Sequence, residues 1–161
     1  MLDSTLFFVP RLLGIPKPWN YGAIPQTWEN PNQKDDHTGY PGDGDPLDVV
    51  DLGVSKLETG DVVPVKVIGG FALIDGGEID WKVVVVRSDD KLSEVINDID
   101  DVEKVFPGKL SVIHNWYKTY KTFEGKGENE FAFGGKPVDR KTISKIIEET
   151  HLQWKQNFAN K

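Results

Sequence analysis

The pattern of hydrophobic and polar positions changes its period about midway along the chain. The first half contains short β-branched and aromatic runs with the length and composition of strands, at residues 47–52, 62–68, 71–74 and 81–86. The last two runs flank residues 75–80, whose Asp and Gly content is typical of a turn. The first half therefore predicts a small, closed, mostly antiparallel β structure.

The second half of the chain favours helices. Apolar residues recur at helical spacing over residues 98–106 and again from Leu110 to Tyr120. Asp139 can cap a final helix whose apolar face consists of Ile143, Ile146, Ile147 and Trp154. Together the two halves predict one α+β domain over residues 1–161, with a β core and helices packed outside it.

Charge narrows the range of partners. Acidic residues outnumber basic ones by 26 to 19, which gives a formal net charge of −7. Such a surface repels nucleic acid and anionic lipid, so we expect neither a nucleic-acid-binding module nor a membrane partner. The chain has no cysteine and no apolar run of membrane-spanning length, and we expect a cytoplasmic protein.

The first candidate for chemistry is the segment 41–48, which places Asp43, Asp45 and Asp48 within six residues. Carboxylates this close repel one another unless they are solvated, protonated or bridged by cations, and hard divalent ions such as Mg²⁺ prefer oxygen ligands. A metal site and a plain solvated acidic turn are about equally compatible with these residues alone. An EF-hand loop is a poorer match, because Leu47 stands where an oxygen ligand is needed.

The second candidate is the turn 75–80 with the residues that follow it. Asp75 and Asp80 stand at the two ends of the predicted turn, and Lys82 shares a strand face with Asp80. A carboxylate and an ammonium on one face can bind a metal ion and a phosphate oxygen side by side. The alternative, favoured for this segment alone, is an exposed hairpin tip with a salt-bridged lysine. Tyr120-Lys121 and Tyr21 add potential phosphate ligands, each weak by itself.

Taken in order, these segments resemble the soluble inorganic pyrophosphatases of the eukaryotic type. The matching residues are 20–29 (NYGAIPQTWE), 42–49 (GDGDPLDV), 75–82 (DGGEIDWK), Tyr120-Lys121 and 128–133 (ENEFAF). The resemblance covers roughly residues 19 to 158. It implies a small closed five-stranded β-barrel of the OB type with helices outside, and hydrolysis of pyrophosphate to two phosphates with several Mg²⁺ ions, or Mn²⁺ as a substitute.

The resemblance also implies a role for each site residue. Asp43, Asp48 and Asp80 would bind the tightest metal ion, with Asp48 touching a second one. Asp75 and Asp80 would receive the metal carried by the substrate, and Asp45 would be the base that holds the metal-activated water. The implied phosphate ligands are Tyr21, Lys82, Tyr120 and Lys121, of which Lys82 and Tyr120 also count as catalytic.

The amino-terminal end of the chain differs from the family pattern. The family carries a Glu, a Lys and an Arg ahead of the Asn-Tyr-Gly-Ala segment, whereas here Leu6 stands at the expected Arg position and Lys17 is the only lysine before residue 20. Arg11 does not match either. We therefore expect an incomplete barrel whose open edges favour a homodimer. The alternative function is a pyrophosphatase-like domain that binds metal and phosphate with little or no turnover.

Overall fold

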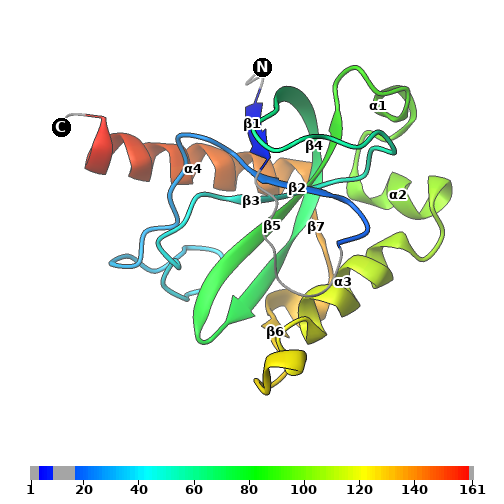
Figure 1. The fold of residues 1–161 in the computed structure, drawn as a ribbon. Coiled ribbons are helices and arrows are strands. Elements are labelled where there is room, and N and C mark those ends of the chain that lie inside the picture. The colour runs from blue at the N-terminus through cyan, green and yellow to red at the C-terminus, as the bar shows by residue number, and fades with distance from the viewer. Residues whose placement is uncertain (1–3, 9–16, 160–161) are drawn as a thin grey trace.

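A long β-hairpin forms the centre of the computed structural model, which describes residues 4–8 as backbone and residues 17–159 in full (Figure 1). The strands are β1 (Ser4–Phe8), β2 (Asn20–Ala23), β3 (Asp48–Asp51), β4 (Val62–Asp75), β5 (Glu78–Arg87), β6 (Glu130–Phe131) and β7 (Val138–Asp139). The α-helices are α1 (Leu92–Val95), α2 (Ile99–Val105), α3 (Lys109–Thr119) and α4 (Arg140–Phe158). The predicted α+β class is confirmed.

The predicted strands at 62–68 and 71–74 are in fact one strand, β4, with a bulge between Val67 and Gly69. The sequence prediction was wrong here because it treated Gly69-Gly70 as a break. A Cβ on Gly69 would lie 2.5 Å from the carbonyl oxygen of Val138, and one on Gly70 would lie 2.6 Å from that of Lys82. The two glycines therefore keep the strand continuous while neighbouring segments approach its backbone closely.

Strand pairing is mostly antiparallel, as predicted, with one parallel exception. The strands follow the order β1-β2-β3-β5-β4-β6, β7 also pairs with β4, and β1 is hydrogen-bonded to both β2 and β4. The parallel pair is β3 with β5, in which Asp48 lies opposite Lys82. This register brings two predicted site residues together from positions far apart in the sequence.

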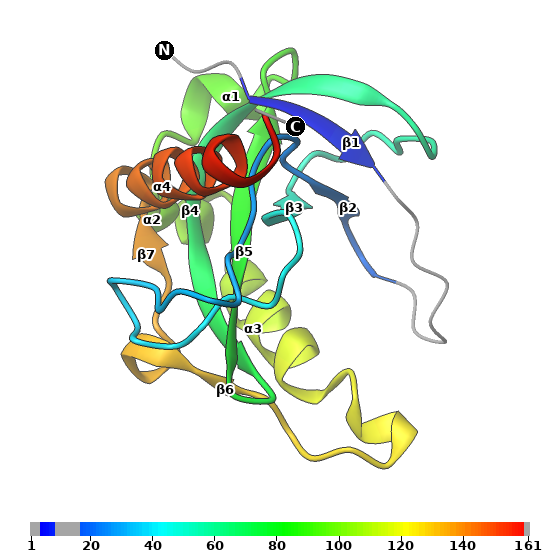
Figure 2. The same cartoon turned by 90° about the vertical axis from the view of Figure 1, so that its left-hand side faces the viewer.

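The core lies on both sides of β5. Trp81, Val83 and Val85 belong to a cluster that includes α4, and Val84 and Val86 belong to a second cluster that includes α2 and α3. Alternate residues of a strand face opposite ways, so a continuous apolar run is the composition needed by a strand covered on both faces. Figure 1 shows α4 on one side of the hairpin and α2 and α3 on the other, and in Figure 2, viewed from the α4 side, α4 lies in front of α2.

The predicted helices at residues 98–106 and from Leu110 to Tyr120 are confirmed within one residue of their expected ends as α2 and α3, and the final helix capped by Asp139 is confirmed as α4. The Asp139 carboxylate accepts a hydrogen bond from the Thr142 amide at 2.8 Å and so caps α4, as expected. The short helix α1 was not predicted, because it has no buried residue of its own to produce an apolar pattern. Among the described residues, no helix is long and apolar enough to cross a membrane.

Candidate active site

A pocket of about 400 Å³ gathers all the predicted site residues. They come from β2, the loop before β3, the first residue of β3, the hairpin β4–β5 and the segment directly after α3, and are Tyr21, Asp43, Asp45, Asp48, Asp75, Asp80, Lys82, Tyr120 and Lys121. This volume falls in the range of small-molecule sites. The structure thus brings together residues that the sequence separates by up to a hundred positions, while their individual roles stay predictions.

The acidic loop that carries Asp43 and Asp45 is held against the segment at Glu29 by backbone hydrogen bonds. The Glu29 amide donates to the Asp45 carbonyl at 2.9 Å, and the Gly44 amide donates to the Glu29 carbonyl at 2.9 Å. A Cβ on Gly42 would stand 2.2 Å from the Glu29 carbonyl carbon, so only glycine permits this contact. Within the described residues the Asp45 carboxylate accepts no hydrogen bond, and it is exposed toward the pocket.

Lys82 links two carboxylates at the floor of the pocket. Its ammonium donates to Asp80 at 2.5 Å and to Asp48, and the Asp48 carboxylate also accepts from the Tyr21 hydroxyl. Burial disfavours a charged lysine, but the two adjacent carboxylates outweigh it and raise the pKa of Lys82. Burial beside Asp48 also raises the pKa of Tyr21, so its hydroxyl remains a donor. The floor is therefore a charged network with only 2% of Lys82 exposed.

At the hairpin tip, the opposite wall of the pocket also combines a carboxylate with a tyrosine and a lysine. Asp75, the last residue of β4, accepts a hydrogen bond from the Tyr120 hydroxyl at 3.2 Å and contacts the Lys121 ammonium. Tyr120 in turn stacks on Trp116 at a centroid distance of 5.1 Å. The residues directly after α3 therefore supply both a neutral donor and a cation to the hairpin carboxylate, while their role as a phosphate-binding pair stays a prediction.

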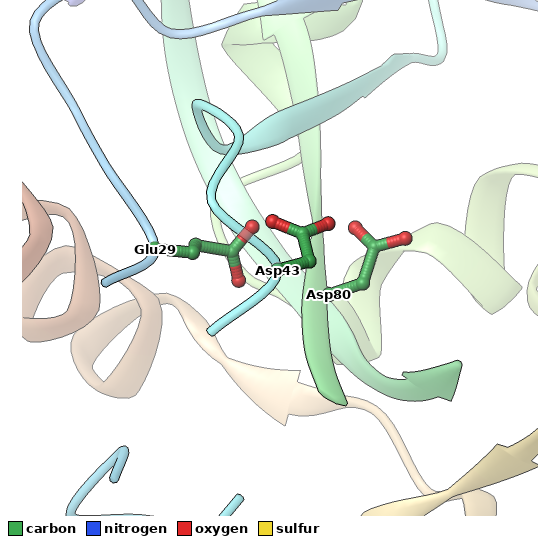
Figure 3. Close-up of side chains that lie close together, drawn as sticks. All are labelled: Glu29, Asp43 and Asp80. Carbon is green, nitrogen blue, oxygen red and sulfur yellow. The ribbon is translucent and has the colours of Figure 1, made fainter. Parts of the chain in front are cut away.

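Three carboxylates from separate segments form the most compact acidic group among the described residues. Ligand oxygens of Glu29, Asp43 and Asp80 lie within 4.8 Å of one another, and Figure 3 shows them side by side. Glu29 is 3% exposed, and its Oε1 accepts the Trp81 amide at 2.9 Å. Its Oε2 is buried and has no hydrogen-bond partner among the described residues.

Burial and mutual repulsion shift the titration of this acidic group. Burial and the neighbouring Asp80 raise the pKa of Asp43 to about 7, and burial is the main cause that raises the pKa of Asp80 to about 6. Burial, together with Asp80 and Asp43, raises the pKa of Glu29 well above its usual range. Such a set of oxygen donors fits a hard divalent cation, which would neutralise the repulsion among the three carboxylates. The Glu29 oxygen that has no hydrogen-bond partner among the described residues would be one of its ligands.

Sequence reasoning missed Glu29 as part of this group and assigned the tightest metal to Asp43, Asp48 and Asp80. The signal available was an acidic residue directly after Trp28, inside the segment 20–29 that matches the family. Lys17, Trp116 and Tyr117 also line the pocket and were not predicted. Arg11 lies outside the described residues.

The first expected result concerns divalent cations. Because a ligand that binds only the folded state shifts the folding equilibrium by mass action, millimolar Mg²⁺ or Mn²⁺ should raise the melting temperature. The measurement is thermal denaturation followed by circular dichroism, with the metal-free protein in chelator as the reference. K⁺ at matched ionic strength controls for charge screening. A melting temperature that responds equally to both salts would contradict a site formed by Glu29, Asp43 and Asp80.

Comparison with known proteins yields a consistent set of relatives. A family model described as inorganic pyrophosphatase matches residues 5–155. The inorganic pyrophosphatase of Encephalitozoon cuniculi is 50% identical over 136 residues, which cover 84% of this chain and 49% of the relative. The structure of inorganic pyrophosphatase from Schistosoma japonicum aligns with a TM-score of 0.84 at 46% identity, covering 86% of this chain and 49% of that one.

A second solved structure adds a ligand-bound relative. The vacuolar soluble pyrophosphatase of Trypanosoma cruzi, truncated by its N-terminal domain and in complex with PPi, aligns with a TM-score of 0.83 at 41% identity. The alignment covers 86% of this chain and 52% of that one. This chain spans about half the length of the curated relatives it matches. The extent of the family match and the identity to these relatives show that the chain belongs to the inorganic pyrophosphatase family.

Proposed function

We propose that this chain hydrolyses inorganic pyrophosphate to two phosphates with Mg²⁺ as its cofactor. The observation that carries the proposal is the pocket itself, in which acidic residues suited to divalent cations alternate with lysine and tyrosine donors suited to phosphate. The PPi complex of the Trypanosoma cruzi relative supports pyrophosphate as the ligand of this pocket. An acidic protein can bind this polyanion because bound cations reverse the local charge.

The acidic side chains would hold the cations and the attacking water. Asp43, Asp48, Asp75 and Asp80 are the proposed metal ligands, and Glu29 fits beside Asp43 and Asp80 as a further oxygen donor. When bound, Mg²⁺ supplies charge neutralisation for the phosphate oxygens and lowers the pKa of water. Asp45, whose carboxylate is exposed toward the pocket, would accept the proton of the attacking water as general base.

The basic and phenolic side chains would bind the phosphate groups. The carboxylates of Asp48 and Asp80 pair with Lys82, and that of Asp75 pairs with Lys121. Cations bound in the pocket would compete with these lysines for the carboxylates. The two ammonium groups would then be available to phosphate oxygens. Tyr21 and Tyr120 keep their protons and donate hydrogen bonds. Since phosphoryl transfer depends mainly on positioning and charge stabilisation, donors held in advance at these places would lower the barrier.

The direct experiment is to measure phosphate release from Mg²⁺-pyrophosphate by the purified chain. The proposal expects hydrolysis that depends on Mg²⁺ and stops in chelator. Binding of pyrophosphate without release would favour the alternative, a pyrophosphatase-like domain that binds metal and phosphate with little turnover. A chain that neither binds nor hydrolyses pyrophosphate would refute both.

We also propose that strands β1 to β5 form the closed OB-type barrel expected for the family. The hydrogen bonding of β1 to both β2 and β4 supports this closure. The homodimer expected from an open barrel edge also stays a proposal, and it would need a surface other than the edges of β1. Sedimentation velocity of the purified chain distinguishes a dimer from a monomer.

A further inference from the structure

Tyr117 is a buried residue of α3 that lines the candidate active site, although the sequence treated it only as part of an apolar helix pattern. Only 2% of the residue is exposed, and it packs in the core cluster that includes α2 and α3. Its hydroxyl oxygen is buried and has no hydrogen-bond partner in the part of the chain that the structure describes. Such a hydroxyl costs stability, so its place beside the pocket calls for an explanation.

The ring of Tyr117 is held in place by neighbouring aromatic rings. Its centroid lies 5.0 Å from that of Trp116, 5.9 Å from that of Trp19 and 6.0 Å from that of Tyr120. The Lys82 ammonium stands 5.1 Å from the same centroid, on the side of the pocket floor. Because buried side chains are close-packed, this ring cannot turn to find another partner for its hydroxyl. The hydroxyl is therefore fixed in position before any ligand arrives.

The groups around this hydroxyl leave it without an acceptor. The indole nitrogens of Trp19 and Trp116 are also buried without a partner among the described residues, and an indole N–H can only donate. The Asp48 carboxylate is close enough to affect the pKa of Tyr117, but it accepts hydrogen bonds from other side chains of the pocket. Burial raises the pKa of Tyr117 more than Lys82 and Trp19 lower it, so the hydroxyl keeps its proton. An anion in the pocket can supply the missing acceptor.

We propose that the Tyr117 hydroxyl donates a hydrogen bond to a phosphate oxygen of the ligand, beside Lys82. The inference rests on the proposed function, because it names a further donor for the same pyrophosphate. Cations that bind Asp48 and Asp80 would make the Lys82 ammonium available to phosphate, and this ammonium lies next to the Tyr117 ring. A phosphate bound by Lys82 would thus reach the part of the pocket that Tyr117 lines. A donor already fixed by packing loses little entropy on binding.

The test compares Tyr117→Phe with the wild-type chain in binding of imidodiphosphate, a pyrophosphate analogue whose bridging nitrogen resists hydrolysis. Calorimetric titration in Mg²⁺ should give about tenfold weaker binding for the variant, the size expected when one hydrogen bond to a charged acceptor is lost. Thermal denaturation without metal or ligand should give a melting temperature no lower than that of the wild type, because the removed hydroxyl has no partner among the described residues. Titration with Mg²⁺ alone should be the same for both proteins.

The matched control is Tyr40→Phe, which makes the same change at a tyrosine that is 37% exposed and does not line the pocket. It should bind imidodiphosphate as the wild type does. Equal affinity in Tyr117→Phe and wild type would overturn the inference and leave the proposed hydrolysis intact. A lower melting temperature of metal-free Tyr117→Phe, or its failure to fold, would assign the hydroxyl a structural role and would also overturn the inference.

Two further outcomes separate the contact from the metal ions and from the reaction. Equal weakening of Mg²⁺ and imidodiphosphate binding in Tyr117→Phe would show that the hydroxyl acts through the metal ions, which contradicts a direct contact with phosphate. A wild-type chain that binds the analogue but releases no phosphate from pyrophosphate would refute the hydrolysis alone, and one that does not bind the analogue would refute both.

Discussion

Asp45→Asn is expected to cut pyrophosphate turnover by about 10² or more while leaving the affinity for Mg²⁺ nearly unchanged. The Asp45 carboxylate accepts no hydrogen bond from the described residues and lies exposed in the pocket, while the backbone of Asp45 is fixed by Glu29 and Asp43. The amide of asparagine keeps this shape but cannot take a proton from water. Steady-state phosphate release at saturating substrate, beside calorimetric Mg²⁺ titration, measures the two effects separately.

Asp48→Asn is the matched comparison, because it makes the same chemical change three residues further along the same acidic segment. Asp48 contacts Lys82 and Tyr21, so its substitution removes a charge from the proposed metal-binding network. We expect weaker Mg²⁺ binding in this variant, in addition to slower turnover. If the two variants lost Mg²⁺ affinity equally, and if turnover fell no further than this loss explains, the roles assigned to Asp45 and Asp48 would be wrong.

Lys82→Met is expected to reduce the free energy of unfolding by roughly 3–5 kcal/mol in the absence of metal, the usual cost of removing one partner from a buried ion pair. Lys82 is 2% exposed and holds both Asp48 and Asp80, so methionine would fill its volume but leave two carboxylates facing each other. Urea denaturation in chelator measures this loss. Mg²⁺ should restore part of the stability, since a cation can replace the missing ammonium.

Lys118→Met provides the control for this experiment. Lys118 pairs with Glu128 at 3.1 Å, but the two side chains are 43% and 56% exposed, and such solvent-accessible pairs contribute about 0–1 kcal/mol. A Lys82→Met protein as stable as Lys118→Met would show that the buried pairs contribute little to folding. A loss of stability that Mg²⁺ leaves unchanged would argue against cation binding near Asp48 and Asp80.

The local features of this protein could be predicted from its sequence. The period of two places Asp80 and Lys82 on one strand face, and the turn composition of residues 75–80 predicts the hairpin tip where Asp75 lies. The cap at Asp139 and the helices that follow the apolar spacing were predicted for the same reason. In each case the interacting residues are neighbours along the chain, so backbone geometry alone decides which side chains meet.

The assembly of the site depended on the tertiary structure. The parallel register of β3 on β5 brings Asp48 to Lys82, and the contact permitted by Gly42 brings the acidic loop to Glu29. Neither follows from spacing, because strand order and backbone packing depend on how the whole core closes. The sequence by itself determined the local elements and the types of residue that could do the chemistry. Only the folded structure decided that Glu29 joins the acidic group and that Lys17 reaches the pocket, since both contacts join segments that are distant along the chain.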